Sequence, residues 1–346
     1  MTTVLCTLYN SLYLDKGLVL YESLCECAKD FKLYVLCMDD KCYEVLADLH
    51  QEHTIPIRLS DFENGDEKLL KAKENRSFGE YCWTCTPSII LYVLEKFKES
   101  ICTYIDADMY FYHDPQILID EMLNSGKSVM IVPHRFSKAN KGLEENGIYC
   151  VEFNTFVNKA DSLDVLSRWR NDCLTCCSSE NDGVHYGDQK YLDTWPQEYG
   201  NVYVCENLGA GVAPWNIQSY LLESYTDNSY LLKTRNDKKH FSIVFYHYQG
   251  IQYIDDNKVK INVYKAQFNI DRLLLLKLYR PYLRKCNHFK KCLSERYGIN
   301  TVIRSHPAFK KMTRRPLITI LSELSFSNIL YRFMLRYNRK KDIICY

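Results

Sequence analysis

Features of exported and membrane-spanning proteins are missing from this chain of 346 residues. Residues 1–10 do not combine a basic stretch with an apolar one, so we expect no secretory signal peptide. No stretch reaches the roughly 18 uninterrupted apolar residues of a membrane-spanning helix. Internal repeats and low-complexity linkers are lacking as well. The sequence therefore predicts a globular protein that remains in the cytoplasm.

A disulfide framework is not expected, although the chain contains 16 cysteines. They are scattered through helix- and strand-like segments, and without an export signal reduced thiols are the expected state. Two Cys-x-x-Cys pairs, Cys82/Cys85 and Cys173/Cys176, have the spacing of zinc ligands. Both fall in helical patterns without knuckle glycines, and no close pair of histidines accompanies them. These thiols are predicted to be buried or incidental.

Charge is unevenly distributed, although the net charge of the whole chain is only +1. Residues 271–346 hold 18 of the 44 lysines and arginines and 4 of the 43 acids, a net charge of +14. Residues 1–270 carry the balance, a net charge of −13. The basic segment is predicted either to attract an anionic membrane surface, at the cytoplasmic face, or to pack against the acidic remainder. Nucleic-acid binding is not expected, because no recognition motif accompanies the charge.

Strand-like apolar stretches alternate with amphipathic helical patterns in the first third of the chain. Strands are predicted at residues 3–8, 31–38, 55–59 and 101–105, and helices at 14–29, 43–50 and 76–97. This alternation indicates βαβ units, and hence an α/β fold with a mostly parallel sheet flanked by helices. Pro87 should kink the last of these helices or begin a new one.

The pattern changes after residue 148. Further strands are predicted at 149–158 and 240–247, and the chain becomes helical and basic after residue 268, with helices at 271–290 and 316–336. We therefore predict one α/β domain over residues 1–268 and a basic helical extension over residues 269–346.

Two carboxylates follow the strand at residues 101–105 directly. Asp106 and Asp108 are separated by one residue, so both can turn toward one point where the buried strand opens into a loop. Ligands of open α/β sheets bind outside the carboxyl ends of the strands. Two converging hard oxygen donors suit a divalent cation that also needs phosphate oxygens and water as ligands. Acidic pairs after strands are common, and the pair alone is a weak signal.

Other polar clusters also lie at predicted strand ends or in loops, where a scaffold presents functional groups. They are Thr7-Leu8-Tyr9-Asn10, Asp39-Asp40, Pro133-His134-Arg135, Phe153-Asn154-Thr155, Gly187-Asp188-Gln189 and His247-Tyr248-Gln249-Gly250. Together with Asp106-Ala107-Asp108, their order and spacing resemble the nucleotide-sugar glycosyltransferases of the GT-A fold, particularly the family 8-like enzymes. The resemblance covers roughly residues 1–255 and implies a Rossmann-like, mixed but mostly parallel sheet.

The resemblance implies roles for these positions. Asp106, Asp108 and His247 would hold Mn²⁺ or Mg²⁺ bound to the donor diphosphate. The remaining donor contacts would be Thr7, Tyr9, Asp39, Asn154 and Gly250, with Asp188 and Gln189 in catalytic positions near the sugar. His134, Arg135 and Trp215 would face the acceptor.

Several of these residues also have purely structural interpretations. His247 could be a core histidine, Asp188 a helix N-cap, and Thr7, Tyr9 and Asp39 strand-end caps. His134 and Arg135 could lie in a solvated loop. One departure concerns the diphosphate: the family usually has Lys-Pro-Trp after the last motif, but Gln252-Tyr253-Ile254 follows here. Lys258, Lys260 or the basic extension could substitute.

The predicted activity is transfer of a sugar from a nucleoside-diphosphate sugar, with a UDP-sugar favoured, to a hydroxyl of a cell-surface glycan or lipid-linked acceptor. The alternative is a catalytically inactive sugar-nucleotide-binding or scaffold protein at the membrane. A phosphatase with an aspartyl-phosphate intermediate is disfavoured, because its Asp-x-Asp normally follows the first strand. Sequence spacing does not separate retention from inversion of configuration.

Overall fold

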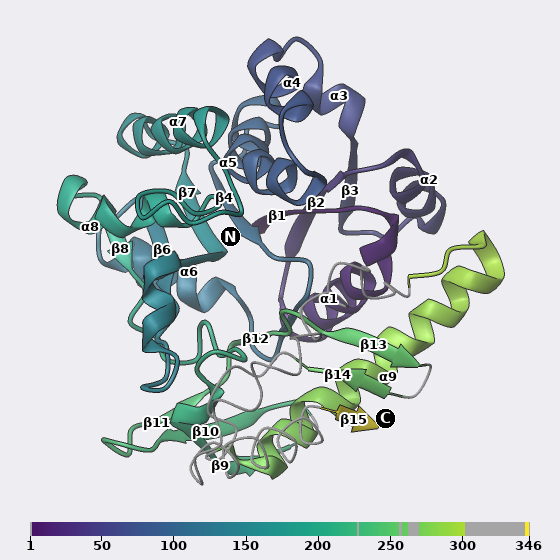
Figure 1. The fold of residues 1–346 in the computed structure, drawn as a ribbon, viewed down its shortest axis with the longest axis vertical. Helices are drawn as coiled ribbons and strands as arrows, with labels where there is room; N and C mark the ends of the chain where they lie inside the picture. Colours follow the sequence, from purple (N-terminus) through teal and green to yellow (C-terminus); the bar gives the residue numbers. More distant parts are fainter. Residues whose placement is uncertain (1, 227, 256–257, 262–269, 302–342, 346) are drawn as a thin grey trace, which may run out of the picture.

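A seven-stranded sheet forms the centre of the molecule (Figure 1). The computed structural model describes residues 2–226, 228–255, 258–261, 270–301 and 343–345. The strands of this sheet are β1 Thr3–Tyr9, β2 Phe31–Cys37, β3 Thr54–Arg58, β4 Ile101–Ile105, β6 Val129–Pro133, β7 Tyr149–Val157 and β8 Val202–Val204. Their order is β3-β2-β1-β4-β7-β6-β8, and all neighbours are parallel except the two pairs that include β7. The expected mixed, mostly parallel sheet is confirmed.

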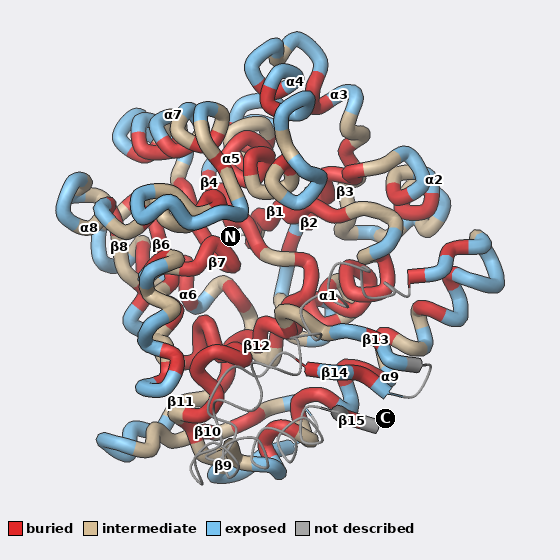
Figure 2. Tube along the Cα trace, in the orientation of Figure 1, coloured by how far each residue is buried: buried red, intermediate tan, exposed pale blue. Residues whose placement is uncertain are grey.

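Helices cover both faces of this sheet, each over its own apolar core, and Figure 2 shows the buried chain between them. One core includes side chains of α1 Leu14–Cys27, α2 Asp40–Leu49 and α6 Gln116–Asn124. The other includes side chains of α3 Leu59–Glu63, α4 Glu67–Glu74, α5 Phe78–Lys96 and α7 Ala160–Thr175. The shorter helices are α8 Trp195–Glu198 and the 3₁₀ turns η1 Ser11–Tyr13, η2 Lys141–Asn146, η3 Lys190–Thr194 and η4 Ile217–Ser219.

The first strand shows why the sequence folds in this way. All seven residues of β1 are buried. Val4 and Cys6 belong to the core beside α5, whereas Leu5 and Tyr9 belong to the core beside α1. Because successive side chains of a strand point to opposite faces, a continuous apolar run fills both cores at once.

Pro87 does not begin a new helix, which was one of the two possibilities predicted for it. Helix α5 runs through Pro87 without a break and begins after Ser77, whose side chain forms a capping box with Glu80. Proline removes one backbone donor, but the residues around Pro87 are buried in the second core, and tertiary packing outweighs local preference.

The predicted strand at residues 240–247 is two strands, β11 His240–Ser242 and β12 Phe245–His247. They separate because they pair in different sheets: β11 with β10 Tyr230–Thr234, and β12 with β5 Met109–Phe111. Between them, the Val244 N–H donates to Gly209 O over 2.9 Å. The β10 strand also pairs with β9 Tyr220–Tyr225.

The described part of the C-terminal extension packs against the rest of the molecule. Helix α9 Arg272–Tyr297 lies along α1, as Figure 1 shows, and Lys285 bonds both Glu22 and Glu26 of α1. Beside it, β14 Lys258–Lys260 pairs with β13 Gln252–Asp255 and β15 Ile343–Cys345. The helix predicted at 316–336 lies outside the described residues. No helix in the part of the chain that the structure describes is long and apolar enough to cross a membrane.

Candidate metal centre and the cavity around it

A strand pair far apart in sequence assembles the candidate metal centre. Asp106 and Asp108 lie between β4 and β5, and β12 pairs antiparallel with β5 so that His247 is opposite Met109. The Tyr248 N–H donates to Asp108 O over 2.8 Å and extends this ladder. Backbone pairing therefore holds His247 beside Asp108 across a sequence separation of 139 residues.

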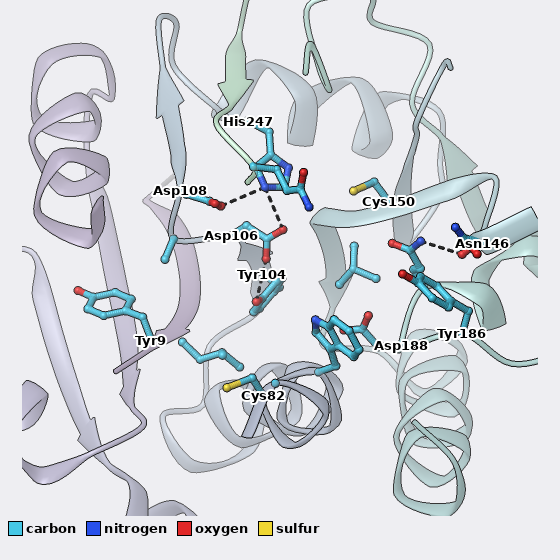
Figure 3. Close-up of a pocket in the computed structure, with 18 of the residues that line it drawn as sticks. Tyr9, Cys82, Tyr104, Asp106, Asp108, Asn146, Cys150, Tyr186, Asp188 and His247 are labelled. Carbon is cyan, nitrogen blue, oxygen red and sulfur yellow. Dashed lines mark hydrogen bonds and ion pairs between the residues drawn. The ribbon is translucent and has the colours of Figure 1, made fainter. Parts of the chain in front are cut away.

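The carboxylates of Asp106 and Asp108 both lie close to one ring nitrogen of His247. His247 Nε2 lies 3.0 Å from Asp108 Oδ1 and 3.6 Å from Asp106 Oδ2 (Figure 3). Tyr104 Oη donates to the other carboxylate oxygen of Asp106 over 3.0 Å. Asp106 is the most accessible of the three, with 31% of its side chain exposed against 11% for Asp108 and 5% for His247.

A fourth ionisable residue, Glu152 of β7, supports the histidine from behind. Its Oε2 lies 2.7 Å from His247 Nδ1, and the carboxylate is fully buried. Glu152 fits only because Gly211 is opposite: a Cβ on Gly211 would lie 2.9 Å from Glu152 Oε1, and this glycine has a φ of +78°. Sequence analysis missed Glu152, because one acid inside an apolar strand carries no motif.

The charges of these groups are strongly coupled. Burial and the neighbouring Asp108 raise the pKa of Asp106 to about 6, although His247 opposes that shift. Burial also acts to raise the pKa of Asp108, but His247 and Lys16 outweigh it and hold that pKa below its usual value. Burial would lower the pKa of His247, yet Asp108, Cys150 and Glu152 together raise it well above its ordinary value. The two aspartates thus share one imidazolium and differ in how readily they lose a proton.

This arrangement fits a divalent cation. Two ligand atoms bound to one cation at about 2.1 Å lie about 3 Å apart, which matches the spacing of the aspartate oxygens from Nε2. A carboxylate on the other ring nitrogen is the usual support of a ligating histidine. The Cys150 sulfur, with Glu152 and His247, forms a second group whose ligand atoms lie within 4.8 Å of one another. We favour the aspartate set because all three of its side chains line the cavity, whereas Glu152 does not.

The cavity has a volume of about 610 Å³, which is in the range of small-molecule sites. It collects residues from β1, α5, β4 and β7 and from the loops that carry Asp188, Trp215 and Gln249. Eight residues predicted from the sequence line it: Tyr9, Asp106, Asp108, His134, Asp188, Gln189, Trp215 and His247.

Asp188 and Gln189 line the cavity as well, and Figure 3 shows Asp188 apart from the group formed by Asp106, Asp108 and His247. Asp188 is buried, and its burial together with the charge of Asp106 raises its pKa to about 7. Its backbone oxygen accepts a hydrogen bond from Trp169 Nε1 over 2.8 Å. Gln189 Nε2 donates to Asn146 O over 2.7 Å. Neither side chain caps η3, which has no side-chain cap.

A separate part of the wall is aromatic. The His134 ring stacks on Phe136 at 4.6 Å between centroids and meets Trp215 edge-on at 5.1 Å. Trp215 also meets the His247 ring edge-on at 5.4 Å. Burial lowers the pKa of His134 to about 3, so this ring is neutral at physiological pH. Trp83 and Tyr186, which the sequence analysis did not include among the site residues, add to the aromatic lining.

Five predicted residues are not in the cavity wall. Thr7 and Asn154 are buried in the sheet, and the side-chain oxygen of Thr7 and both polar atoms of Asn154 lack hydrogen-bond partners. Asp39 caps α2 through Cys42 N and also accepts from Ser11. The Arg135 guanidinium donates to the carbonyl oxygens of Cys205 and Ala210, each over 2.6 Å. Gly250, with a φ of +79°, lies in the turn after His247.

The lysines suggested as substitutes after the last motif do not line the cavity. Lys258 and Lys260 of β14 are exposed, and the buried residue between them is Val259. By contrast, Lys16 of α1 is buried close to the cavity. Sequence analysis missed Lys16, because a charged residue in the first turn of an amphipathic helix usually faces solvent.

The fold and the site define an α/β protein with a candidate metal centre in a cavity at the strand ends. The chain belongs to the same family as the uncharacterized protein YfnD of Bacillus subtilis strain 168. The two are 31% identical over 282 residues, which cover 80% of this chain and 86% of YfnD. A second protein of that strain, the uncharacterized YfnF, is 29% identical over 269 residues, or 75% of this chain and 85% of YfnF. No family model matches the sequence.

The solved structures to which the chain is similar include GT-A glycosyltransferases. The galactosyltransferase LgtC, solved with donor and acceptor sugar analogs, is 13% identical with a TM-score of 0.46, over 72% of this chain and 87% of LgtC. Mouse xyloside xylosyltransferase 1 is 11% identical with a TM-score of 0.44, over 62% of this chain and 87% of that one. These likenesses are too distant to bear on activity.

Proposed function

We propose that this protein is a metal-dependent glycosyltransferase that uses a nucleoside-diphosphate sugar, with a UDP-sugar favoured. The observation that carries this proposal is the convergence of Asp106, Asp108 and the Glu152-supported His247 on one wall of a cavity at the strand ends. Such a set can hold Mn²⁺ or Mg²⁺, and a divalent cation bound there would stabilise the negative charge of the leaving nucleoside diphosphate.

The residues of the chain would then have distinct tasks. Asp106, Asp108 and His247 hold the charged end of the donor, while Glu152 fixes the orientation of the imidazole. Tyr9, at the end of β1, lines the side of the cavity proposed for the nucleoside. Asp188 and Gln189, which also line the cavity, would lie near the transferred sugar. The carboxyl group of Asp188, with a pKa of about 7, can exchange a proton with a hydroxyl near neutral pH.

The aromatic wall is the proposed acceptor side. His134 and Trp215 offer ring faces and edges against which a sugar ring can pack. We propose a glycan or lipid-linked acceptor, because the basic C-terminal segment would bring the enzyme to an anionic cytoplasmic membrane face. Most of that basic segment, residues 302–342, lies outside the described residues.

Binding measurements with nucleoside diphosphates test the proposal. Calorimetric titrations of UDP, GDP, CDP and dTDP, with and without Mn²⁺, should show binding of one of them that depends on the metal. The Asp106→Asn/Asp108→Asn variant should lose this binding, while the exposed Asp164→Asn variant should keep it. Hydrolysis or transfer of the matching nucleotide sugar would then establish turnover. Metal-dependent binding without any turnover would favour the inactive sugar-nucleotide-binding alternative, and no binding at all would refute both.

A further inference from the structure

A buried lysine lies beside the candidate metal centre and makes no ion pair with the residues that the structure describes. Lys16, in the first turn of α1, is only 2% exposed. Its Nζ lies over the face of the Tyr13 ring, 3.8 Å from the centroid, and 5.9 Å from the centroid of Tyr253. Within the described part of the chain, no carboxylate oxygen lies within 4.0 Å of Nζ.

Burying an ammonium group without a directly paired carboxylate costs free energy, so other contacts must offset this cost. The neighbouring Asp15 is fully buried, but its Oδ2 accepts from Tyr253 Oη over 2.9 Å and its Oδ1 has no partner. Asp15 therefore balances the charge of Lys16 without contacting it. The contact that holds Nζ is the cation–π interaction with Tyr13.

Tyr13 places this cation next to the cavity. The Tyr13 side chain lines the cavity together with Asp106, Asp108 and His247, and Lys16 lies directly behind its ring. Only the Tyr13 ring therefore separates the buried ammonium group of Lys16 from this part of the cavity. In this dry environment a fixed positive charge acts over a longer distance than it would in water.

We propose that Lys16 is a fixed positive charge that stabilises the diphosphate of the donor, acting from behind Tyr13. This inference rests on the proposed function, since it assigns a ligand charge to the same cavity. A diphosphate held by Asp106, Asp108 and His247 through a cation has more negative charge than the cation alone neutralises. A preorganised cation that needs no proton transfer compensates the remainder. Lys258 and Lys260 are exposed and do not line the cavity.

The competing explanation is structural: Lys16 only balances the buried charge of Asp15. Two variants separate the explanations. Lys16→Met removes the cation but keeps the length of the side chain, and Asp15→Asn/Lys16→Met removes both charges and so restores their balance. Lys16→Arg serves as the control that keeps the charge. Each protein is titrated first with Mn²⁺ alone and then, at saturating Mn²⁺, with the nucleoside diphosphate that the wild type binds.

The proposal predicts that removing the charge weakens binding of the nucleoside diphosphate but not of Mn²⁺. Removing a cation near Asp108 should leave Mn²⁺ binding unchanged or make it tighter. Binding of the nucleoside diphosphate should weaken by about 10-fold or more in Lys16→Met and in the double variant, as for loss of an interaction with a charged group. Lys16→Arg should retain most of the affinity. Affinity for the unphosphorylated nucleoside should not change.

Three outcomes would overturn the proposal. If the double variant regains wild-type affinity for the diphosphate, Lys16 has only the structural role. If Lys16→Met binds the diphosphate as tightly as the wild type does, the charge does not act on the ligand, although the proposed function stands. If the wild type binds none of UDP, GDP, CDP and dTDP with Mn²⁺, the proposed function itself fails, and the role of Lys16 fails with it.

Discussion

Ionisable side chains that are buried in this protein are concentrated around one cavity. Asp108, Asp188 and His247 are all less than a tenth exposed, and charged neighbours help to shift the pKa of each of them. Desolvation alone would neutralise each group, so the charged state of one depends on the position of its neighbours. A single substitution at one of these positions should therefore also change the charge of its neighbours, and so should have a large effect on ligand binding.

The Glu152–His247 contact gives the first prediction. Glu152→Gln keeps the shape of the side chain but removes the carboxylate that fixes the imidazole through Nδ1. We expect Mn²⁺ affinity to fall by about 10- to 100-fold, as is typical for loss of a partner behind a metal ligand. Isothermal titration calorimetry checks this, with the exposed Glu145→Gln variant as the matched control. Equal Mn²⁺ affinities in the two variants would contradict the role of Glu152.

His134 should make stability depend on pH. Its pKa is about 3 when folded, because burial disfavours the charged ring, against about 6.5 in the unfolded chain. Between these two pH values the unfolded state binds more protons than the folded state does. The contribution of the neutral His134 to the free energy of unfolding is therefore complete above pH 6.5 and is lost as the pH falls. The loss is at most about 1.4 kcal/mol per pH unit.

The comparison with a variant isolates this contribution, because the raised pKa values of Asp106 and Asp188 act in the opposite direction. Denaturant unfolding of the wild type and of His134→Gln, measured from pH 6.5 to pH 4, should show a shallower decline in the variant. Parallel curves for the two proteins would show that His134 takes up its proton without cost.

Gly17 is required because the ring of Tyr9 packs directly against its Cα, where no side chain would fit. A Cβ at this position would lie 2.4 Å from Cζ of Tyr9, the residue that lines the proposed nucleoside side. Gly17→Ala should displace the Tyr9 ring and weaken nucleoside-diphosphate binding, with a loss of stability of about 1–3 kcal/mol from overpacking. Calorimetry and chemical denaturation measure the two effects. Gly200→Ala is the control, since nothing lies within 4 Å of a Cβ there and this exposed residue does not line the cavity.

At the scale of elements, α9 and β12 form one unit. Both neighbours of His247 are anchored in α9: Tyr248 stacks on Tyr282 at 3.6 Å and donates to Leu278 O over 2.9 Å, and Tyr246 Oη lies 3.2 Å from Tyr279 Oη. We therefore propose that α9 belongs to the catalytic unit. The boundary predicted at residue 268 would then separate a metal ligand from the helix that positions it.

This coupling gives a prediction about Tyr282. Tyr282→Ala should destabilise the protein by about 3–5 kcal/mol, because a fully buried aromatic ring is removed. It should also weaken Mn²⁺ binding, since β12 loses its support. Urea unfolding and metal titration check both effects, with the exposed Leu273→Ala as the control. Loss of stability without any change in metal affinity would separate α9 from the site.

Helices and strands were easier to predict from the sequence than the contacts between distant ones. The strands β1, β2 and β4 are mostly apolar and buried, and the Asp-x-Asp after β4 has a recognisable spacing. Glu152 had no local signal, because its partner is 95 residues away. The division of residues 240–247 into two strands also depends on distant pairing. Patterns near in sequence predict elements, whereas contacts between distant segments complete the site.

At the scale of the whole molecule, the charge asymmetry predicts salt-sensitive membrane binding. Residues 271–346 carry a net charge of +14. Replacing Arg339, Lys340 and Lys341 by glutamine should weaken binding to phosphatidylserine vesicles by about 1 kcal/mol per cation, or roughly 100-fold in total. Vesicle sedimentation at low and high salt checks this. The control replaces the exposed lysines Lys68, Lys71 and Lys138; equal losses in both variants would mean that net charge alone matters.

The pairing of β5 with β12 also bears on how the protein is made. A ribosome that has released the first 200 residues has already supplied six of the seven strands of the central sheet, but not His247 or α9. Assembly of the proposed metal centre therefore waits until β12 has been synthesised and can pair with β5. A chain that stalls before residue 245 would lack His247, so under the proposed function it could not form the complete centre, which ties ligand binding to completed synthesis.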